Sequence, residues 1–565
     1  MDSKPREYRF LRTSLAIFAM TLCLGVAASW SPAATVIYVG PSAGGLYNTP
    51  AYWHTGAVPG AADLSIFNGD TNVDGTITFD ADTANYRTFV QNTAGVIEFD
   101  TGDYTWSLSG FMLVGGGVEN SPTIKHSNGK IDFNRILLGS AGVGPSVEVT
   151  GANTHFHTRR GSGGYSIGVP ANRTSMLVHN GARMSADGQA IIGLSGSSNS
   201  SLTIDGAGST MELGNYLGVG HSGGAANATG NMASIINGAT GAATHILMAI
   251  TTGSTDNTLT VSGAGSKLTL LRGRESSVGM AGINNLLQIM DGATVDGGGY
   301  FVIGNDTSNS GNQVVVNNGT LDVTGIEAQR GSVTVTNGTV AVSQWLNADE
   351  EWEGGNITVS DDAAASFTFN SGTVGSVSAD VNNGVAFTVG DGGGSDAIYN
   401  MKKDAAGANG THAFTSGLSL GSNGVLSGNG NIVGDVSGTA GATVDVGNSA
   451  GQINVGGAWD NRGIDIGLEL TDLLDITGVF THGGGISVDV SGAALSGDLK
   501  LIGWGDQAGD SSDTSVSFAG GAMSYEFRSD GFYVVPEPGT LALLVLGLTI
   551  AVAAHGRQSN AKRSI

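Results

Sequence analysis

Between residues 60 and 340 the chain alternates apolar and polar residues over short stretches, and each stretch ends at a glycine-containing turn. Leu202 and Ile204 belong to one such stretch, and Leu259 and Val261 to another. Residues two apart share one face of a strand, so each stretch predicts a strand with one buried face. Helical periodicity is nearly absent between residues 35 and 535. The pattern therefore predicts an all-β fold.

The stretches repeat along the chain. Residues 201–209 read SLTIDGAGS and residues 258–266 read TLTVSGAGS. Turn glycines recur at positions mostly 22 to 32 residues apart, and an apolar residue followed by glycine marks a second turn after most of them. The turn glycines are Gly129, Gly151, Gly181, Gly206, Gly238, Gly263, Gly292, Gly319 and Gly338. The second turns are Leu138-Gly139, Ile167-Gly168, Ile192-Gly193, Val219-Gly220, Val278-Gly279 and Ile303-Gly304.

Each repeat predicts two or three short strands, too few to bury an apolar face alone. Coaxial stacking of repeats forms a continuous core and pairs every strand with its neighbours above and below. We therefore expect a right-handed parallel β-helix, with the handedness taken from the crossover rule. At about 22 to 28 residues per coil, residues 60–340 would form roughly ten to twelve coils. A β-sandwich array or a propeller stays open, because the spacing varies.

Three zones divide the predicted β region. Residues 35–110 contain Tyr47, Tyr52 and Trp53, which predict an aromatic cap over the first coil, with a sugar-stacking platform as the alternative. Residues 110–345 hold the clearest repeats. Residues 345–352, rich in acidic side chains, interrupt the pattern and are either a boundary or an inserted loop. Residues 346–534 form a second β-solenoid segment.

Both ends of the chain are basic and apolar. Lys4, Arg6, Arg9 and Arg12 precede an apolar stretch that ends in small residues near Ala28. This pattern predicts a secretory signal peptide within residues 1–34, cleaved between residues 28 and 34. The only cysteine, Cys23, leaves with it, so the exported part has neither disulfides nor thiol chemistry.

The other end, residues 535–565, has three parts in order: a proline-containing motif, an apolar run and a basic tail. The motif is Val535, Pro536, Glu537 and Pro538; the apolar run includes Leu541, Leu543, Leu544, Leu546, Leu548 and Ile550; the tail contains Arg557, Lys562 and Arg563. The two prolines favour an extended backbone, the apolar run predicts a short membrane helix, and the basic residues favour the cytoplasm.

This tripartite tail resembles the PEP-CTERM sorting signal of Gram-negative bacteria. The resemblance implies a transient membrane anchor that an exosortase-type membrane peptidase recognises and cleaves near the motif. It also implies export across the inner membrane and a cell-surface or extracellular location after processing. Residues 426–436, 446–451 and 474–478 resemble the C-terminal part of autotransporter passenger β-helices. That second resemblance implies a β-helix and no particular chemistry.

Charge narrows the range of partners. The whole chain has a net charge of −24. Residues 1–34 carry +2 and residues 539–565 carry +3, so residues 35–538 carry −29. Phosphate binding needs clustered lysine and arginine, and we read the exported region as lacking such clusters, so no nucleic-acid partner is expected. Divalent cations or cationic surfaces suit this region better.

Candidate chemistry is sparse. His155, His157, Arg159 and Arg160 are the densest polar group of the repeats and predict a solvent-facing rung. The pair Asp361-Asp362 has no evident basic partner and predicts a solvated turn. Residues 390–396 could bind calcium, although the calcium-binding repeat occurs there only once. We expect no catalytic residue, no metal site and no cofactor, with calcium as the one candidate.

The sequence thus predicts a non-enzymatic, surface-sorted structural or adhesive β-solenoid of the envelope, extracellular matrix or biofilm. The alternative is a polysaccharide-binding or polysaccharide-degrading β-helix protein, suggested by the fold and by Tyr52, Trp53, Tyr104 and Trp106. The repeat pattern also predicts that Ile204 and Val261 point into a shared core, so that Ile204→Asp and Val261→Asp would each destabilise the fold markedly, and that Ser209→Asp would matter little.

Overall fold

The computed structural model describes most of the chain between residues 34 and 535. The described residues are 34–67, 73–91, 95–115, 122–139, 144–159, 165–169 (backbone only), 172–221, 227–271, 273–305, 310–346, 351–447, 451–491, 495, 497–521 and 523–535. They form strands, turns and three short 3-10 helices at Pro50–Tyr52, Leu194–Gly196 and Ser511–Asp513, without an α-helix among them. The chain divides into two compact units, residues 1–368 and residues 369–565.

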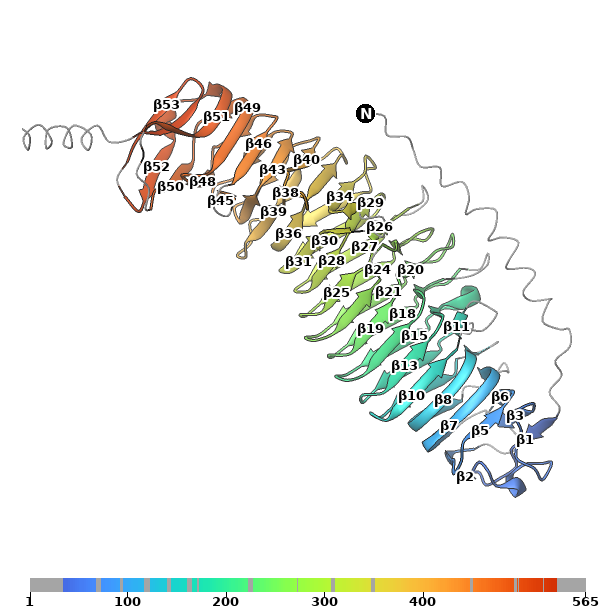
Figure 1. Ribbon diagram of the computed structural model, residues 1–565. Coiled ribbons are helices and arrows are strands. Elements are labelled where there is room, and N and C mark those ends of the chain that lie inside the picture. Colours follow the sequence, from blue (N-terminus) through green and yellow to red (C-terminus); the bar gives the residue numbers. More distant parts are fainter. Residues whose placement is uncertain are drawn as a thin grey trace, which may run out of the picture. The chain divides into compact units, whose positions relative to one another are not determined.

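The first unit winds in coils of three strands. β12 (Ser175–His179) pairs in parallel with β9 (Ser146–Thr150) on one side and with β15 (Ser201–Asp205) on the other. Each partner lies three strands away in the sequence, so strands of one coil bond to the coils before and after it. Figure 1 shows the labelled strands of this unit following one another in this way. Such pairing is that of a parallel β-solenoid, and it confirms the all-β, stacked-coil prediction.

Three faces, which we name A, B and C, result from this pairing. Face A consists of β9, β12, β15, β18 (Met232–Ile236), β21 (Thr258–Ser262), β24 (Leu286–Met290), β27 (Gln313–Asn317) and β30 (Ser332–Thr336). Face B consists of β10 (Thr154–Thr158), β13 (Arg183–Ala186), β16 (Thr210–Leu213), β19 (Thr240–Ala243), β22 (Lys267–Leu270), β25 (Thr294–Gly297), β28 (Thr320–Val323) and β31 (Gly338–Val342). Face C consists of β11 (Tyr165–Val169), β14 (Gln189–Ile192), β17 (Leu217–Val219), β20 (Ile246–Met248), β23 (Ser276–Val278), β26 (Tyr300–Ile303), β29 (Gly325–Ala328) and β34 (Asn356–Val359).

The first coils use longer strands. β8 (Thr123–Leu138) contributes to all three faces, because it pairs in turn with β9, β10 and β11. β7 (Val96–Val114) pairs along most of β8. The strands before them are β1 (Thr35–Ile37), β2 (Gly44–Leu46), β3 (Leu64–Phe67), β4 (Gly75–Thr78), β5 (Thr83–Asn85) and β6 (Arg87–Val90).

The described residues on either side of positions 347–350 form an inserted pair of strands, which we call the inserted hairpin of the first unit. β32 (Gln344–Leu346) and β33 (Trp352–Gly354) pair with each other in antiparallel fashion, between β31 and β34. This pairing of the flanking residues fits the inserted-loop interpretation of the segment. The division between the two units lies at residues 368 and 369.

The second unit has the same parallel, three-strand pattern, as in β36 (Gly372–Ser376) with β39 (Ala397–Met401) and β39 with β42 (Gly424–Gly428). It closes with antiparallel pairs of β51 (Leu499–Ala508) with β54 (Gly531–Val535) and of β53 (Ser524–Arg528) with β54. β35 (Ser366–Phe369) contains the division, and the later strands are β36 (Gly372–Ser376), β37 (Ser378–Val381), β38 (Phe387–Val389), β39 (Ala397–Met401), β40 (Gly410–Phe414), β41 (Leu418–Leu420), β42 (Gly424–Gly428), β43 (Gly430–Val433), β44 (Val436–Gly438), β45 (Ala442–Val446), β46 (Gln452–Val455), β47 (Trp459–Asp460), β48 (Ile464–Glu469), β49 (Leu473–Thr481), β50 (Gly485–Asp489), β51 (Leu499–Ala508), β52 (Ser515–Ala519), β53 (Ser524–Arg528) and β54 (Gly531–Val535).

Aliphatic side chains stack along the inside of face A. The register aligns Val178, Ile204, Ile235, Val261 and Ile289 in successive coils. Each of them is at most 1% exposed, which confirms the predicted burial of Ile204 and Val261. The β-branched shape of these residues suits a pleated surface that is packed on one side.

Four asparagines, each directly before a strand of face A, form a hydrogen-bonded ladder that runs from coil to coil in the interior. Asn231, Asn257, Asn285 and Asn312 are each fully buried. Asn231 Nδ2 donates to Asn257 Oδ1 at 3.0 Å, and the next two steps of the ladder are 2.9 Å each. Asn257 Oδ1 also accepts from the Asn231 backbone N–H at 3.1 Å, while Asn257 Nδ2 donates to the Ala228 carbonyl at 3.0 Å. The amides thus bond one another and the main chain, so their burial is compensated.

The ladder explains three glycines of the second set, Gly193, Gly220 and Gly279, because an added Cβ at each would meet a ladder asparagine. Gly193, Gly220 and Gly279 follow face C strands with φ of 89°, 68° and 76°. A Cβ added at Gly220 would lie 2.3 Å from Nδ2 of Asn257, so the amide occupies the space that a side chain would need. Ala249 stands at the matching place after β20 and has φ of 50°, where alanine is strained.

Ser209 contradicts the sequence-based expectation. It is fully buried, and its Oγ accepts a hydrogen bond from the Gly181 backbone N–H at 3.0 Å. Ser266 makes the same bond to Gly238 at 2.9 Å. The prediction that Ser209→Asp would be harmless is wrong, because this side chain ties its coil to the turn of the preceding one. A carboxylate there would be larger than the hydroxyl and charged.

Substitutions of residues on the two faces of one strand test the register. We expect Ile204→Asp to destabilise the fold by roughly 3 kcal/mol or more, since it buries an unpaired carboxylate. Ser209→Asp should also lower stability. Thr203→Asp, on the outward side of the same strand, should change it by about 0.5 kcal/mol or less. Thermal unfolding followed by circular dichroism measures this, and equal melting temperatures for Ile204→Asp and Thr203→Asp would refute the register.

A pair of glycine variants tests the ladder. Gly206 has φ of 88° and no atom within 4 Å of an added Cβ, so Gly206→Ala should cost only about 1 kcal/mol of backbone strain. Gly220→Ala adds a clash with Asn257 and should cost about 3 kcal/mol, because it also breaks buried hydrogen bonds. Chemical denaturation of both variants gives the comparison. An equal loss in the two would mean that the ladder adds nothing beyond backbone geometry.

Candidate functional site

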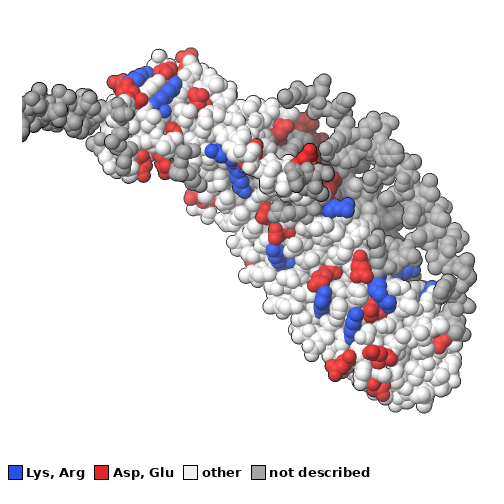
Figure 2. Space-filling view, in the orientation of Figure 1, with Lys and Arg blue, Asp and Glu red and all other residues white. Residues whose placement is uncertain are grey.

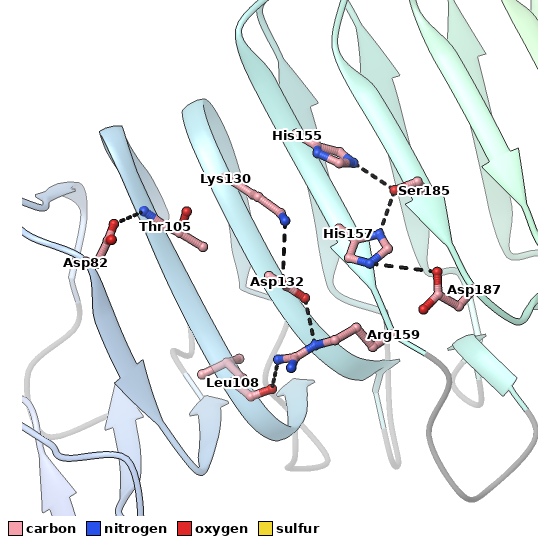
Figure 3. Close-up of polar contacts among 10 residues, drawn as sticks. All are labelled: Asp82, Thr105, Leu108, Lys130, Asp132, His155, His157, Arg159, Ser185 and Asp187. Atoms are coloured by element: carbon pink, nitrogen blue, oxygen red, sulfur yellow. Dashed lines mark hydrogen bonds and ion pairs between the residues drawn. The ribbon is translucent and has the colours of Figure 1, made fainter.

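A polar cluster on face B is the most concentrated group of chemically active side chains that the sequence analysis singled out. Figure 3 shows it: Lys130 and Asp132 on β8, His155 and His157 on β10 with Arg159 after it, and Ser185 on β13 with Asp187 after it. We call these seven residues the face B cluster.

The strand register brings this cluster together. His157 lies between Asp132 on β8 and Ser185 on β13, while His155 lies between Lys130 and Arg183. Phe156, between the two histidines in sequence, is fully buried. Alternation along β10 therefore turns both imidazoles outward on one surface.

Ser185 bonds to both imidazoles. Its Oγ lies 2.7 Å from His155 Nε2 and 2.7 Å from His157 Nδ1. A hydroxyl has one hydrogen, so Ser185 donates to one ring and accepts from the other. The other nitrogen of His157, Nε2, lies 3.9 Å from Oδ1 of Asp187.

Asp132 holds the opposite side of the cluster. Its carboxylate lies 2.9 Å from Arg159 Nε and 3.4 Å from Lys130 Nζ. Arg159 also donates from Nη2 to the Leu108 carbonyl at 3.0 Å, so it joins β10 to β7. Burial is the main cause that lowers the pKa of His155 to about 4, and the positive charges of Arg183 and Lys130 add to it. His155 is therefore neutral at neutral pH.

The serine and histidine pairing has only part of the geometry of a hydrolytic triad. In a triad, a carboxylate accepts a hydrogen bond from the imidazole and holds its tautomer. The 3.9 Å between His157 and Asp187 is longer than a hydrogen bond. The side chains instead bond across neighbouring coils, as a surface rung does. Arg160, the fourth residue of the predicted group, lies outside the described residues.

Sequence reasoning missed Ser185 and Asp187. Ser185 follows His157 by 28 residues, which is one coil. The repeat spacing was visible in the sequence, so aligning neighbouring coils would have placed this serine beside the histidines. The sequence alone does not give the register to the single residue, and a slip of one residue would have turned Ser185 inward.

Basic residues are more clustered than the sequence argument held. Seven of the 17 lysines and arginines of residues 35–538 lie within residues 125–183: Lys125, Lys130, Arg135, Arg159, Arg160, Arg173 and Arg183. Several are paired with acids, such as Lys125 with Glu98 at 3.2 Å and Arg183 with Glu212 at 2.5 Å. Figure 2 shows blue and red side chains interleaved on the visible face of this unit. The absence of a nucleic-acid partner thus stays an expectation, resting on pairing rather than on a lack of clusters.

Two acidic residues from the sequence-based candidate sites, Asp362 and Asp391, have interaction partners in the structure. Asp362 lies 3.2 Å from Nη1 of Arg330, so the expectation that it has no basic partner is wrong. Within residues 390–396, Asp391 is exposed and its Oδ1 accepts from the Gly393 backbone N–H at 2.7 Å, as in an Asx turn. Among the residues that the structure describes, no three histidine, cysteine or acidic side chains lie close enough to hold a metal ion.

The aromatic residues suggested as a sugar platform lie mostly in the core. Trp53 and Trp106 are 2% and 0% exposed. Trp106 Nε1 donates to Asn85 Oδ1 at 2.7 Å, and the rings of Tyr47 and Trp53 are 5.0 Å apart. Neither indole can offer its face to a sugar. Tyr104 is 37% exposed.

The export and sorting residues fall almost entirely outside the described part of the chain. Val535 is the last residue of β54, and Pro536, Glu537, Pro538, the apolar run and the basic tail follow it. The signal peptide also lies outside. Within residues 34–535, as far as they are described, the structure holds no helix with the length and apolar character to cross a membrane.

Comparisons with protein-family models, with curated proteins and with solved structures each gave no match.

One buried histidine generates a prediction on acid stability. His126 is fully buried, its Nε2 lies 3.0 Å from the Asn128 carbonyl, and burial lowers its pKa to about 3. An unfolded histidine titrates near 6.5. As pH falls below that value, the unfolded state binds a proton that the folded state does not, so stability is lost between about pH 6.5 and 3.

His126→Leu should remove this part of the pH dependence, since the aligned residues Phe99 and Val149 are apolar. At pH 4.5 the variant should gain roughly 2–3 kcal/mol relative to the wild type, compared with the difference at pH 7.5. Denaturation at the two pH values measures this change. If the free energies of unfolding of the two proteins changed equally between pH 7.5 and pH 4.5, His126 would take up a proton as readily in the folded state as in the unfolded state, which would contradict the prediction.

Proposed function

We propose that this protein is exported by its signal peptide and sorted to the cell surface by an exosortase-type peptidase, where it serves as a structural or adhesive component. In this proposal it is a non-enzymatic, right-handed β-helix of the envelope, extracellular matrix or biofilm. The observation that carries the structural role is the parallel pairing of successive coils within the first unit. The asparagine ladder adds buried hydrogen bonds between these coils.

Such a core suits an exported protein without disulfides. Cys23 is the only cysteine of the chain and belongs to the predicted signal peptide. Stability outside the cell must then come from packing and from hydrogen bonds between coils. The ladder supplies buried bonds of this kind, and the net charge of −29 for residues 35–538 favours solubility.

The position of the sorting motif also supports the proposal. Val535 pairs with Ser524 across β54 and β53, and Pro536 follows directly. Cleavage after this strand would release the second unit with its last antiparallel pair complete. The short apolar run and the basic tail would then stay behind with the peptidase.

The polysaccharide-degrading alternative finds less support. Its best candidate is Ser185 between two imidazoles, and there the nearest carboxylate of His157, that of Asp187, lies beyond hydrogen-bond distance. A binding role without cleavage agrees with an adhesive function.

Truncation tests sorting. Deleting residues 536–565 leaves β54 intact, so the variant should fold and still be exported, but it should lose surface sorting and C-terminal processing. Immunoblots of cell fractions and mass spectrometry of the mature C-terminus give the readout. A double variant, Pro536→Ala with Pro538→Ala, keeps the apolar run and isolates the motif. Location and processing identical to the wild type in both variants would contradict the proposal.

A further inference from the structure

The inserted hairpin of the first unit presents one exposed face. In its register Gln344 pairs with Gly354, Trp345 with Glu353, and Leu346 with Trp352. Cross-strand partners lie on the same side of an antiparallel pair, and neighbours in sequence lie on opposite sides. Leu346 and Trp352 therefore share one side of the hairpin, and Trp345 lies on the other.

Trp345 fastens the hairpin to the solenoid. Gly273, in the turn between β22 and β23, has φ of 79°, and a Cβ added to it would lie 2.7 Å from Cζ2 and 2.8 Å from Cη2 of Trp345. The indole thus rests on the backbone of an earlier coil, in a place where only glycine leaves room. The side that carries Trp345 faces the solenoid, so the opposite side faces solvent.

The exposed fractions agree with this orientation. Leu346 is 47% exposed and Trp352 is 54% exposed. In contrast, Trp53, Trp106, Trp459 and Trp504 are at most 5% exposed. The indole of Trp352 and the side chain of Leu346 thus leave adjoining apolar surface in water, which marks this side of the hairpin as a contact surface.

The small area of this surface and the negative charge of the chain restrict the class of ligand that it can bind. A stable protein interface buries about 800 Å² on each partner, far more than two side chains of a short hairpin offer. Residues 35–538 carry a net charge of −29, so a polyanion would be repelled. A pyranose ring is uncharged and has an apolar C–H face that can stack on an indole.

We propose that the Trp352 side of the hairpin binds a neutral polysaccharide, with one sugar ring stacked on the indole and Leu346 beside it. This inference goes beyond the proposed sorting and structural role, since it assigns the surface and the ligand class by which the protein would attach to matrix. The protein could be sorted normally without it.

Affinity electrophoresis of the full-length protein through gels that contain hydroxyethyl cellulose, dextran or soluble starch tests the proposal. At least one neutral polymer should retard the wild type. Trp352→Ala should weaken retardation tenfold or more without changing the melting temperature, because the side chain is exposed. Tyr104→Ala removes another exposed aromatic residue, on β7, and should leave binding unchanged. Trp345→Ala frees the hairpin and should also weaken binding.

Collisional quenching gives an independent readout. Acrylamide should quench the fluorescence of Trp352 in the free protein, and the bound polysaccharide should protect it; this protection should be missing in Trp352→Ala. The proposal is overturned if no neutral polymer retards the wild type, if Trp352→Ala binds as the wild type does, or if polygalacturonate binds as tightly as the neutral polymers. Sorting is measured separately, so its failure is distinguishable from any of these outcomes.

Discussion

The parallel hydrogen bonds between coils set the register on which every other feature of the first unit depends. Because each strand is aligned residue by residue with the strands one coil away, aliphatic side chains such as Ile204 and Val261 form one continuous stack. The same alignment places Asn231 next to Asn257 and excludes a side chain at Gly220. A slip of one residue would expose the stack and break the ladder together.

The register also governs the surface chemistry. Residues about one coil apart become neighbours, which explains why Ser185 meets two histidines and why ion pairs such as Lys267 with Asp296, 29 residues apart, recur on the outside. Such exposed pairs add little to stability, typically about 0–1 kcal/mol each. Their effect is rather to balance charge locally on a chain that is strongly acidic elsewhere.

Local patterns predicted the strands well, because alternation and turn glycines act within a few residues. They did not predict features that depend on contacts between coils. The ladder spacings of 26, 28 and 27 residues were present in the sequence, yet an asparagine before a strand is ordinary turn chemistry until its neighbours are known. Ser209 was misjudged for the same reason. The packing of Trp345 on Gly273 joins residues from separate coils, and no local rule anticipates it.

The asparagine ladder has a consequence for how such a chain can change in length. Each rung repeats the same bonds, to the neighbouring amides and to nearby main-chain groups, so one rung can take the place of another. Removing residues 231–256 would bring Asn257 to the place of Asn231 and leave a ladder that is shorter by one rung but unbroken. Whole coils are thus units that duplication or loss can add or subtract, and the reach of the molecule becomes its most easily varied property.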